Sequence, residues 1–151
     1  MPATTTPPKP RVFVDADVLF AGAAAGSEHS ASLVVLRMAE ITLIDALASQ
    51  QVIEECERSL SAKIPAALPA FRMLVSRGLQ IVASPSAADL TAYARLADPK
   101  DLPILIAALQ TNCSWLVTFN VRHFQPGHPQ ITVLRPGDFV LRVRELLAYL
   151  P

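Results

Sequence analysis

The amino-acid sequence predicts an α/β protein, a three-layer α/β/α sandwich with a central parallel sheet. Two observations predict this class. Short apolar runs of strand length, such as residues 11–14, alternate along the chain with longer segments of helical character. The hydrophobic fraction is 52% and the charged fraction 17%, so the chain has enough apolar residues for a core. Strands that alternate with helices favour a parallel sheet that helices cover on both faces.

The expected elements follow one another from residue 11 onwards. Apolar runs predict strands at residues 11–14, 42–44, 79–83, 115–119 and 131–134. Helical patterns predict helices at residues 30–41, 51–63, 65–77, 87–96, 102–110 and 136–150, and the Ala-rich residues 18–27 predict a loop or a short helix. Pro65 and Gly78 are expected to open and close one of these helices, and Asp101 to cap another.

The chain is predicted to form one domain with a short tail. Residues 1–10, MPATTTPPKP, are rich in Thr and Pro and are expected to be flexible. The remaining residues, 11–151, fit a single domain and show no internal repeat. Residues 102–121 lack charge and are long enough to cross a bilayer, but the polar residues 110–114 interrupt them. We therefore expect no membrane span.

Charge and cysteine content narrow the range of functions. The 13 basic residues balance the 13 acidic ones, so no global positive field attracts nucleic acid to this protein. RNA binding, if present, has to come from a local patch or from metal ions. Cys56 and Cys113 lie far apart without metal-ligand spacing, which argues against a disulfide framework or a zinc site. We expect a reduced, cytoplasmic protein.

Polar side chains gather where two of the predicted strands end. Asp15 and Asp17 follow the first strand, and Thr118 and Asn120 end the strand at residues 115–119. Open parallel sheets bind their ligands outside the carboxyl ends of the strands. The sequence therefore predicts a functional site at this edge of the sheet.

Further carboxylates are expected near the same edge. Asp101 heads the helix that leads into the strand at 115–119, and Glu54 and Glu55 lie near the start of helix 51–63. Adjacent helical residues point in different directions, so at most one of these two glutamates is expected to enter the site. Clustered carboxylates repel one another and are stabilised by a cation. Oxygen ligands without thiolates favour Mg²⁺ or Mn²⁺, which is the chemistry of phosphodiester hydrolysis.

Several segments resemble, in order and spacing, the motifs of the PIN domain family. Residues 12–19, VFVDADVL, resemble the opening motif, and residues 52–56, VIEEC, resemble the helix that carries the second acidic residue. Residues 98–108, DPKDLPILIAA, and 116–124, LVTFNVRHF, resemble the third and fourth motifs, and 131–139, ITVLRPGDF, the last strand and helix entry. The resemblance covers residues 11–147 and implies a PIN-like fold.

The resemblance also implies a metal site. Asp15 and Asp101 would be the main ligands of Mg²⁺ or Mn²⁺, and Glu55 would complete the acidic pocket, with Glu54 in its place if the register differs by one. Asn120 stands where the family often has Asp, and its amide oxygen offers a lone pair without a charge. A second metal would then bind weakly or only together with substrate.

Four other residues complete the predicted site. The resemblance implies that Asp17, which replaces the usual Asn, orients the first loop and that Thr118 supports the site by hydrogen bonding. Lys100 and Arg122 are the best candidates for contacts with substrate phosphates, ahead of Arg135, Arg142 and Arg144. Asp98, which precedes Pro99, is expected to serve a turn, and His123 is expected to lie outside the site.

The function implied by the resemblance is endonucleolytic cleavage of single-stranded RNA, which leaves a 5′-phosphate on one product. Many relatives are VapC-type toxins, so an antitoxin protein and a homodimer are possible partners. Two alternatives remain open at this stage. The first is a PIN-like scaffold that binds RNA or protein without cleaving, which Asn120 and the neutral net charge favour. The second is a haloacid-dehalogenase-like phosphatase with Asp15 as its nucleophile.

Overall fold

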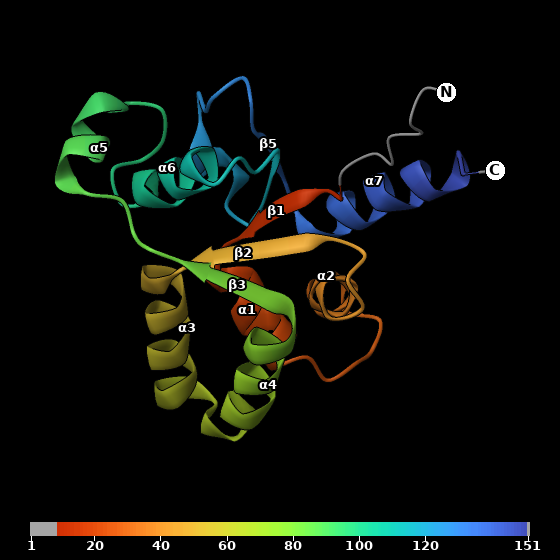
Figure 1. Cartoon of the computed structure of the whole chain (residues 1–151). Helices are drawn as coiled ribbons and strands as arrows, with labels where there is room; N and C mark the ends of the chain where they lie inside the picture. Colours follow the sequence, from red (N-terminus) through yellow and green to blue (C-terminus); the bar gives the residue numbers. More distant parts are fainter. Residues whose placement is uncertain (1–8, 151) are drawn as a thin grey trace.

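Five parallel strands form one sheet in the computed structural model, which describes residues 9–150 (Figure 1). They are β1 (Arg11–Val14), β2 (Asp45–Ser49), β3 (Leu79–Val82), β4 (Trp115–Val117) and β5 (Thr132–Leu134). Their order across the sheet is β3-β2-β1-β4-β5, and every neighbouring pair is parallel. Residues 1–8 of the predicted tail lie outside the described residues.

Helices cover both faces of the sheet. They are α1 (Ala16–Ala23), α2 (Ala31–Glu40), α3 (Gln50–Lys63), α4 (Leu68–Gly78), α5 (Ala87–Ala92), α6 (Leu102–Gln110) and α7 (Pro136–Ala148), with short 3₁₀ helices η1 (Pro65–Ala67) and η2 (Val121–Phe124). Helices α1 to α4 pack together on one side, where α2 also contacts α7, whereas α5 and α6 lie on the other side (Figure 1). The predicted three-layer α/β/α class is therefore confirmed.

The core lies around the central strands and α6. Val12, Phe13 and Val14 of β1 are fully buried because β1 is the middle strand and has helices on both of its faces. Six of the nine residues of α6, from Leu102 to Ala108, are buried as well. A helix that is apolar on all sides needs such surroundings. The rigid centre of the molecule thus positions the residues that follow β1 and β4.

Strand β2 begins three residues later than the sequence predicts, so the expected strand at 42–44 is wrong. Thr42 has a φ of 64°, which belongs to a turn and not to a strand. The Leu43 N–H donates to the Met38 carbonyl, so this segment completes the end of α2. The strand starts where the Asp45 N–H donates to the Pro10 carbonyl beside β1. β-Propensity favoured the Thr-Leu-Ile run, but pairing with β1 decides the register.

The predicted helix at 65–77 is divided in the structure. A 3₁₀ turn, Pro65–Ala67, precedes α4, and α4 continues to Gly78 instead of ending before it. A Cβ at Gly78 would lie 3.2 Å from the Ala39 Cβ atom and 3.3 Å from the Glu40 backbone nitrogen. The glycine therefore allows α4 to approach α2 closely, and it is not a left-handed helix cap.

The apolar segment at 102–121 folds as the polar break at 110–114 predicts. Helix α6 ends at Gln110, a turn with Asn112 at a φ of 57° follows, and β4 begins at Trp115. Within residues 9–150, no helix is both long and apolar enough to cross a membrane.

Candidate metal centre

A cleft of about 540 Å³ opens at the carboxyl edge of the sheet. It lies beside β1, where the chain crosses to β2 on one side and to β4 on the other, which is the usual ligand position in such sheets. Its lining residues come from the segments that follow β1 and β4 and from the starts of α3 and α6: Asp15, Ala16, Asp17, Gln51, Glu54, Glu55, Arg58, Asp98, Lys100, Asp101, Ile104, Asn120 and His123. Six carboxyl groups thus share the cleft with two fixed cations.

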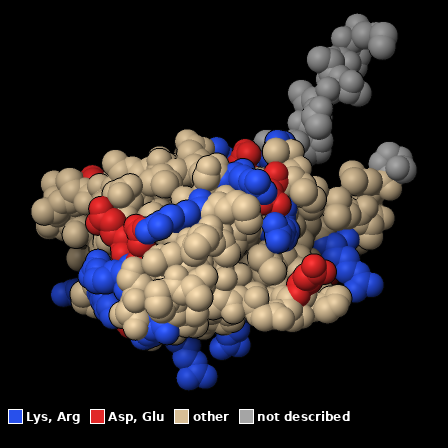
Figure 2. Space-filling model, turned by 90° about the horizontal axis from the view of Figure 1, so that it is seen from below, with Lys and Arg blue, Asp and Glu red and all other residues tan. Residues whose placement is uncertain are grey.

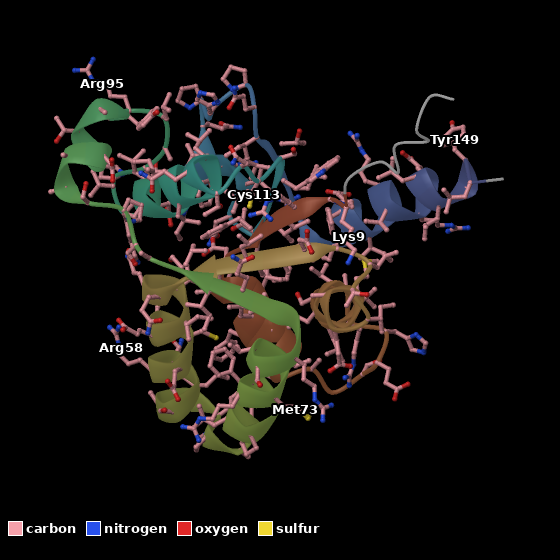
Figure 3. All side chains as sticks on the ribbon, viewed as in Figure 1. Lys9, Arg58, Met73, Arg95, Cys113 and Tyr149 are labelled. Atoms are coloured by element: carbon pink, nitrogen blue, oxygen red, sulfur yellow. The ribbon has the colours of Figure 1, made fainter. Side chains whose placement is uncertain are left out.

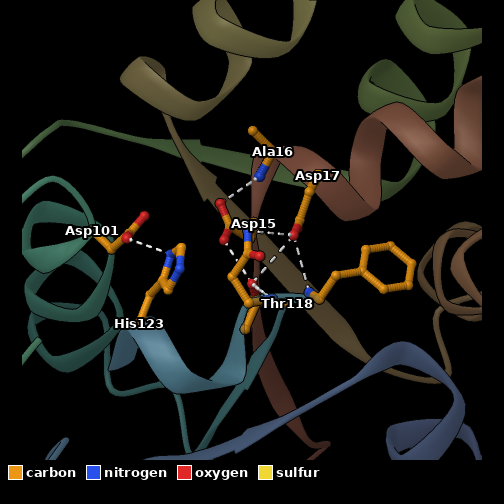
Figure 4. A network of polar contacts seen from close by, with 8 residues as sticks. Asp15, Ala16, Asp17, Asp101, Thr118 and His123 are labelled. Atoms are coloured by element: carbon orange, nitrogen blue, oxygen red, sulfur yellow. Dashed lines mark hydrogen bonds and ion pairs between the residues drawn. The ribbon is translucent and has the colours of Figure 1, made fainter. Parts of the chain in front are cut away.

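Asp15 is held at the end of β1 by backbone and side-chain hydrogen bonds. Its N–H donates to the Val117 carbonyl at 3.0 Å, which fixes the residue at the edge of the sheet. Its Oδ1 accepts from the Ala16 N–H at 2.7 Å, and its Oδ2 accepts from the Thr118 hydroxyl at 2.8 Å (Figure 4). The side chain is 5% exposed, so the carboxyl group has a single, well-defined orientation at the base of the cleft.

Asp17, in the first turn of α1, connects this helix with the loop after β4. Its Oδ2 accepts from the Phe119 N–H at 3.0 Å and from the Asn120 side-chain amide at 3.3 Å (Figure 4). Its Oδ1 is buried, and among residues 9–150 it has no hydrogen-bond partner. A buried carboxylate oxygen without a partner is costly, so this atom marks a place where a cation or a bound water is needed.

Thr118 is the central hydroxyl of the site. It is fully buried, donates its proton to Asp15 and accepts from the Asn120 N–H at 3.0 Å. Asn120 itself is exposed and lines the cleft. The structure therefore brings Asp15, Asp17, Thr118 and Asn120 together, although the two pairs lie at least 101 positions apart along the chain.

Asp101 occupies the N-cap position of α6, but its side chain makes no capping hydrogen bond. Instead, Asp101 Oδ2 lies 3.1 Å from His123 Nδ1 (Figure 4). The expectation that His123 lies outside the site is therefore wrong. The His123 carbonyl accepts from the Asp98 N–H at 2.8 Å, which ties η2 to the loop before α6 and carries the imidazole to the cleft.

Asp98 also has more than the expected role in a turn. Its carbonyl accepts the N–H groups of Asp101 and Leu102, as a turn residue's does. Its carboxylate also lies in the cleft. A carboxylate oxygen of Asp98, a carboxylate oxygen of Asp101 and a ring nitrogen of His123 lie within 4.8 Å of one another. The sequence did contain a signal for the presence of Asp98 in the site. The Asp-Pro-Lys-Asp run places the carboxylates of Asp98 and Asp101 three residues apart.

Glu54 and Glu55 both reach the cleft, so the expectation of one at most is wrong. Glu55 is half-buried, whereas Glu54 is exposed and accepts from the Gln50 side-chain amide at 3.2 Å. Arg58, which sequence reasoning missed, lies on α3 four residues after Glu54 (Figure 3). It also lines the cleft.

The predicted substrate-binding cations lie in two places. Lys100 lines the cleft itself, whereas Arg122 lines an adjoining pocket together with Arg135. On the face drawn in Figure 2, Lys and Arg side chains lie among Asp and Glu side chains and form no continuous basic surface. This distribution agrees with the net charge of zero.

The protonation of the cleft reflects its buried charges. The pKa of Asp15 is raised to about 7: burial raises it most and the neighbouring Asp17 and Asp101 charges also raise it, whereas the hydrogen bonds from Thr118 and Ala16 lower it. Burial also raises the pKa of Asp17. The ionised form of this pair is thus unfavourable without a counter-charge. A donor set of carboxylate oxygens, with one orphaned oxygen on Asp17, fits a hard divalent cation.

Solved structures with the same fold include three with TM-scores of 0.57 to 0.64. VapBC2 from Rickettsia felis, described as bound to a DNA fragment from its promoter, is 18% identical over 82% of this chain and 96% of that chain, with a TM-score of 0.61. PAE2754 from Pyrobaculum aerophilum is 16% identical over 90% and 96%, with a TM-score of 0.64. Mycobacterium tuberculosis VapC20, described as a Sarcin-Ricin loop cleaving toxin, is 15% identical over 80% and 98%, with a TM-score of 0.57.

The sequence itself matches one protein family. No curated protein matches the chain. The family model for the PIN domain matches residues 11–122, which include the segments that follow β1 and β4 and all the acidic residues of the cleft. This match covers more than half of the chain and agrees with the fold of the three solved structures. The chain belongs to the PIN domain family.

Proposed function

We propose that this chain is a metal-dependent endoribonuclease that hydrolyses phosphodiester bonds in single-stranded RNA. One observation carries the proposal: Asp15 and Asp101, which lie 86 positions apart, line one acidic cleft at the carboxyl edge of a PIN domain sheet. The raised pKa of Asp15 and the orphaned Asp17 oxygen support a cation in this cleft.

The proposed ligands of Mg²⁺ or Mn²⁺ are Asp15, Asp101, Glu55 and Asn120. Such a cation supplies positive charge for the scissile phosphate and activates water. Asp17 is a positioning residue, because its Oδ2 holds the backbone of Phe119 and the amide of Asn120. Thr118 is a second one, because its hydroxyl fixes the orientation of the Asp15 carboxyl group.

Lys100 and Arg122 are the proposed contacts to RNA phosphates outside the metal centre. Lys100 lines the cleft, and Arg122 lines the pocket beside it. In a chain without net charge, these local cations are what attracts a polyanion. Cleavage would leave a 5′-phosphate on one product.

We further propose that the protein is a cytoplasmic toxin that binds an antitoxin protein. The support is the fold that the chain shares with VapBC2 and VapC20. A homodimer is part of this proposal. Its support is the set of exposed apolar side chains near the end of α7, which includes Leu146, Leu147 and Leu150.

The proposal is tested by two isosteric substitutions in the cleft. Asp15→Asn and Asp101→Asn each remove one charge, and each is expected to reduce Mn²⁺-dependent cleavage of a single-stranded RNA by about 100-fold or more. Glu145→Gln, on the exposed face of α7, is the matched control and should cleave like the wild type. Circular dichroism checks that the variants are folded. Unchanged cleavage by both Asp variants would refute the assigned site.

The non-catalytic scaffold stays a second candidate because of one observation. The Asn120 side-chain amide donates to Asp17 and adds no charge to the cleft, so its oxygen is a weaker ligand than a carboxylate. Calorimetric titration with Mn²⁺ separates the two functions. The nuclease is expected to bind Mn²⁺ with a heat that Asp15→Asn removes, whereas a scaffold would give no such heat.

The phosphatase alternative finds little support in the geometry. The PIN domain model matches residues 11–122, and Asp15 is only 5% exposed, which leaves little room for a phosphate to be attacked directly by its carboxylate. Trapping of a phosphorylated Asp15 would reverse this preference.

A further inference from the structure

A second pocket, with a volume of about 340 Å³, adjoins the acidic cleft. The two cavities share Asn120 and His123 in their linings, so they are neighbours at the carboxyl edge of the sheet. The pocket is lined by residues 119–123, which come after β4, and by Arg135, which comes directly after β5. The proposed metal chemistry gives this pocket no role of its own.

The pairing of β4 with β5 brings these segments together. Val117 pairs with Leu134, and the Thr118 N–H then donates to the Leu134 carbonyl at 3.0 Å. Phe119 lies two residues after the end of β4 and Arg135 lies one residue after the end of β5, so both lie at the same edge of the sheet. The position of Arg135 relative to the cleft is thus set by strand register.

The charge of the pocket is opposite to that of the cleft. Arg122 and Arg135 line it, and no carboxylate does. Among residues 9–150, neither arginine has a carboxylate within 4.0 Å, so both guanidinium groups are available to an anion from solution. Guanidinium groups bind phosphate oxygens in bidentate geometry, which makes the pocket suited to a backbone phosphate.

Phe119 adds an aromatic surface to the rim of this pocket. It is 44% exposed, although it lies only two residues after a strand that is largely buried. Its N–H donates to Asp17 Oδ2, and the next N–H donates to the Thr118 hydroxyl, so its backbone is fixed by the site itself. An exposed ring on a rigid backbone is the kind of platform on which unpaired bases stack.

We propose that Phe119, Arg122 and Arg135 form a binding subsite for a nucleotide of single-stranded RNA next to the scissile phosphate. This inference rests on the proposed nuclease function and deepens it. The two arginines contact backbone phosphates, and the Phe119 ring stacks on an unpaired base. Bases in a duplex already stack on their neighbours, so the subsite selects single strands over duplexes. The strand therefore leaves the acidic cleft across the ends of β4 and β5.

The test measures binding apart from cleavage. Fluorescence anisotropy with a short fluorescein-labelled RNA, in EDTA and at low salt, gives the Kd of wild type and variants. Phe119→Ala is expected to weaken binding by about 5- to 100-fold, and Phe119→Trp to retain it. Arg135→Ala is expected to weaken binding and to lower the magnitude of the slope of log K against log salt by about 1.

Two control variants change similar side chains that do not line the pocket. Tyr149→Ala removes an exposed aromatic ring near the end of α7, on the opposite side of the molecule from Arg58 (Figure 3). Arg142→Ala removes an exposed arginine from the same helix. Both controls should bind RNA like the wild type, and a labelled duplex should bind less tightly than the single strand.

The outcomes separate this inference from the nuclease proposal. If Mn²⁺-dependent cleavage occurs and Phe119→Ala and Arg135→Ala bind like the wild type, the subsite is refuted and the nuclease stands. If no cleavage occurs but the two variants bind more weakly than the controls, the subsite stands and the nuclease fails. Wild-type protein that binds no single-stranded RNA at low salt, or binds duplex equally well, also refutes the subsite.

Discussion

Asp15 is the single residue on which the chemistry of the site depends most. Its carboxyl group is buried by the folding of β1 against β4, and this burial, with the Asp17 charge, raises its pKa to about 7. The folded state therefore binds a proton that the unfolded chain, with the ordinary value of 3.8, releases. Ionisation of Asp15 opposes folding unless a cation is present.

The sign of this effect gives a prediction for the metal-free protein. Because the folded-state pKa is above the unfolded one, stability is expected to fall as pH rises from about 4 to about 7, by an amount on the order of a few kcal/mol. Asp15→Asn removes the titration, so its melting temperature in EDTA should depend less on pH and exceed the wild-type value at pH 8. Thermal melts from pH 5 to 8 measure this, and identical curves for the two proteins would contradict it.

Sequence reasoning at this scale found residues but not their contacts. Asp15, Asp17 and Thr118 follow strands, and the carboxyl-edge rule was sufficient to bring them together. His123 was misplaced because a lone histidine beside an apolar residue carries no local signal. Its position depends on the buried Phe124, which anchors η2, and on a hydrogen bond between residues 98 and 123. Such contacts across a fold are not visible in one sequence.

Helix α6 shows how an element positions the site. Leu105 and Ile106 are fully buried, and Asp101 is the N-cap of the helix, so the packing of α6 sets where that carboxylate lies.

Most elements were predictable to within a few residues, because their apolar runs have the length and period of strands or helices. Strand β2 was not, since its register depends on pairing with β1 and not on the β-propensity of residues 42–44.

A cavity in α6 is expected to reduce stability without changing the chemistry. Leu105→Ala should lower the free energy of unfolding by about 2 to 5 kcal/mol, because the side chain is fully buried. Leu141→Ala, at a position that is 53% exposed on α7, should change it by less than about 0.5 kcal/mol. Urea denaturation measures both. Equal losses for the two variants would contradict the assigned core.

The whole molecule has no net charge, and this limits how it meets RNA. Acidic residues line the cleft, and the cations beside them are few: Arg58 and Lys100 in the cleft, and Arg122 and Arg135 in the adjoining pocket. The composition alone predicted that RNA binding needs such a local group of cations. The sequence indicated Lys100 and Arg122, but it ranked Arg135 behind them and missed Arg58, because the neighbours of a cation come from other elements of the fold.

The small number of cations predicts that the affinity for RNA depends only weakly on salt concentration. If roughly three phosphates are contacted, log K for a single strand should fall with log salt with a slope of about −2. Anisotropy titrations at several KCl concentrations measure the slope. A much steeper value would mean that a larger basic surface is involved than the described residues show.

The central claim is that a divalent cation binds between the carboxylates of Asp15 and Asp101. It is tested most directly by a crystal soaked in Mn²⁺, with anomalous diffraction used to locate the ion. We expect an anomalous peak within ligand distance of both carboxylates, at roughly the 2.0 to 2.1 Å typical of small divalent cations such as Mg²⁺. A cleft without a peak, or a peak held only by Asp98 and His123, would contradict the account.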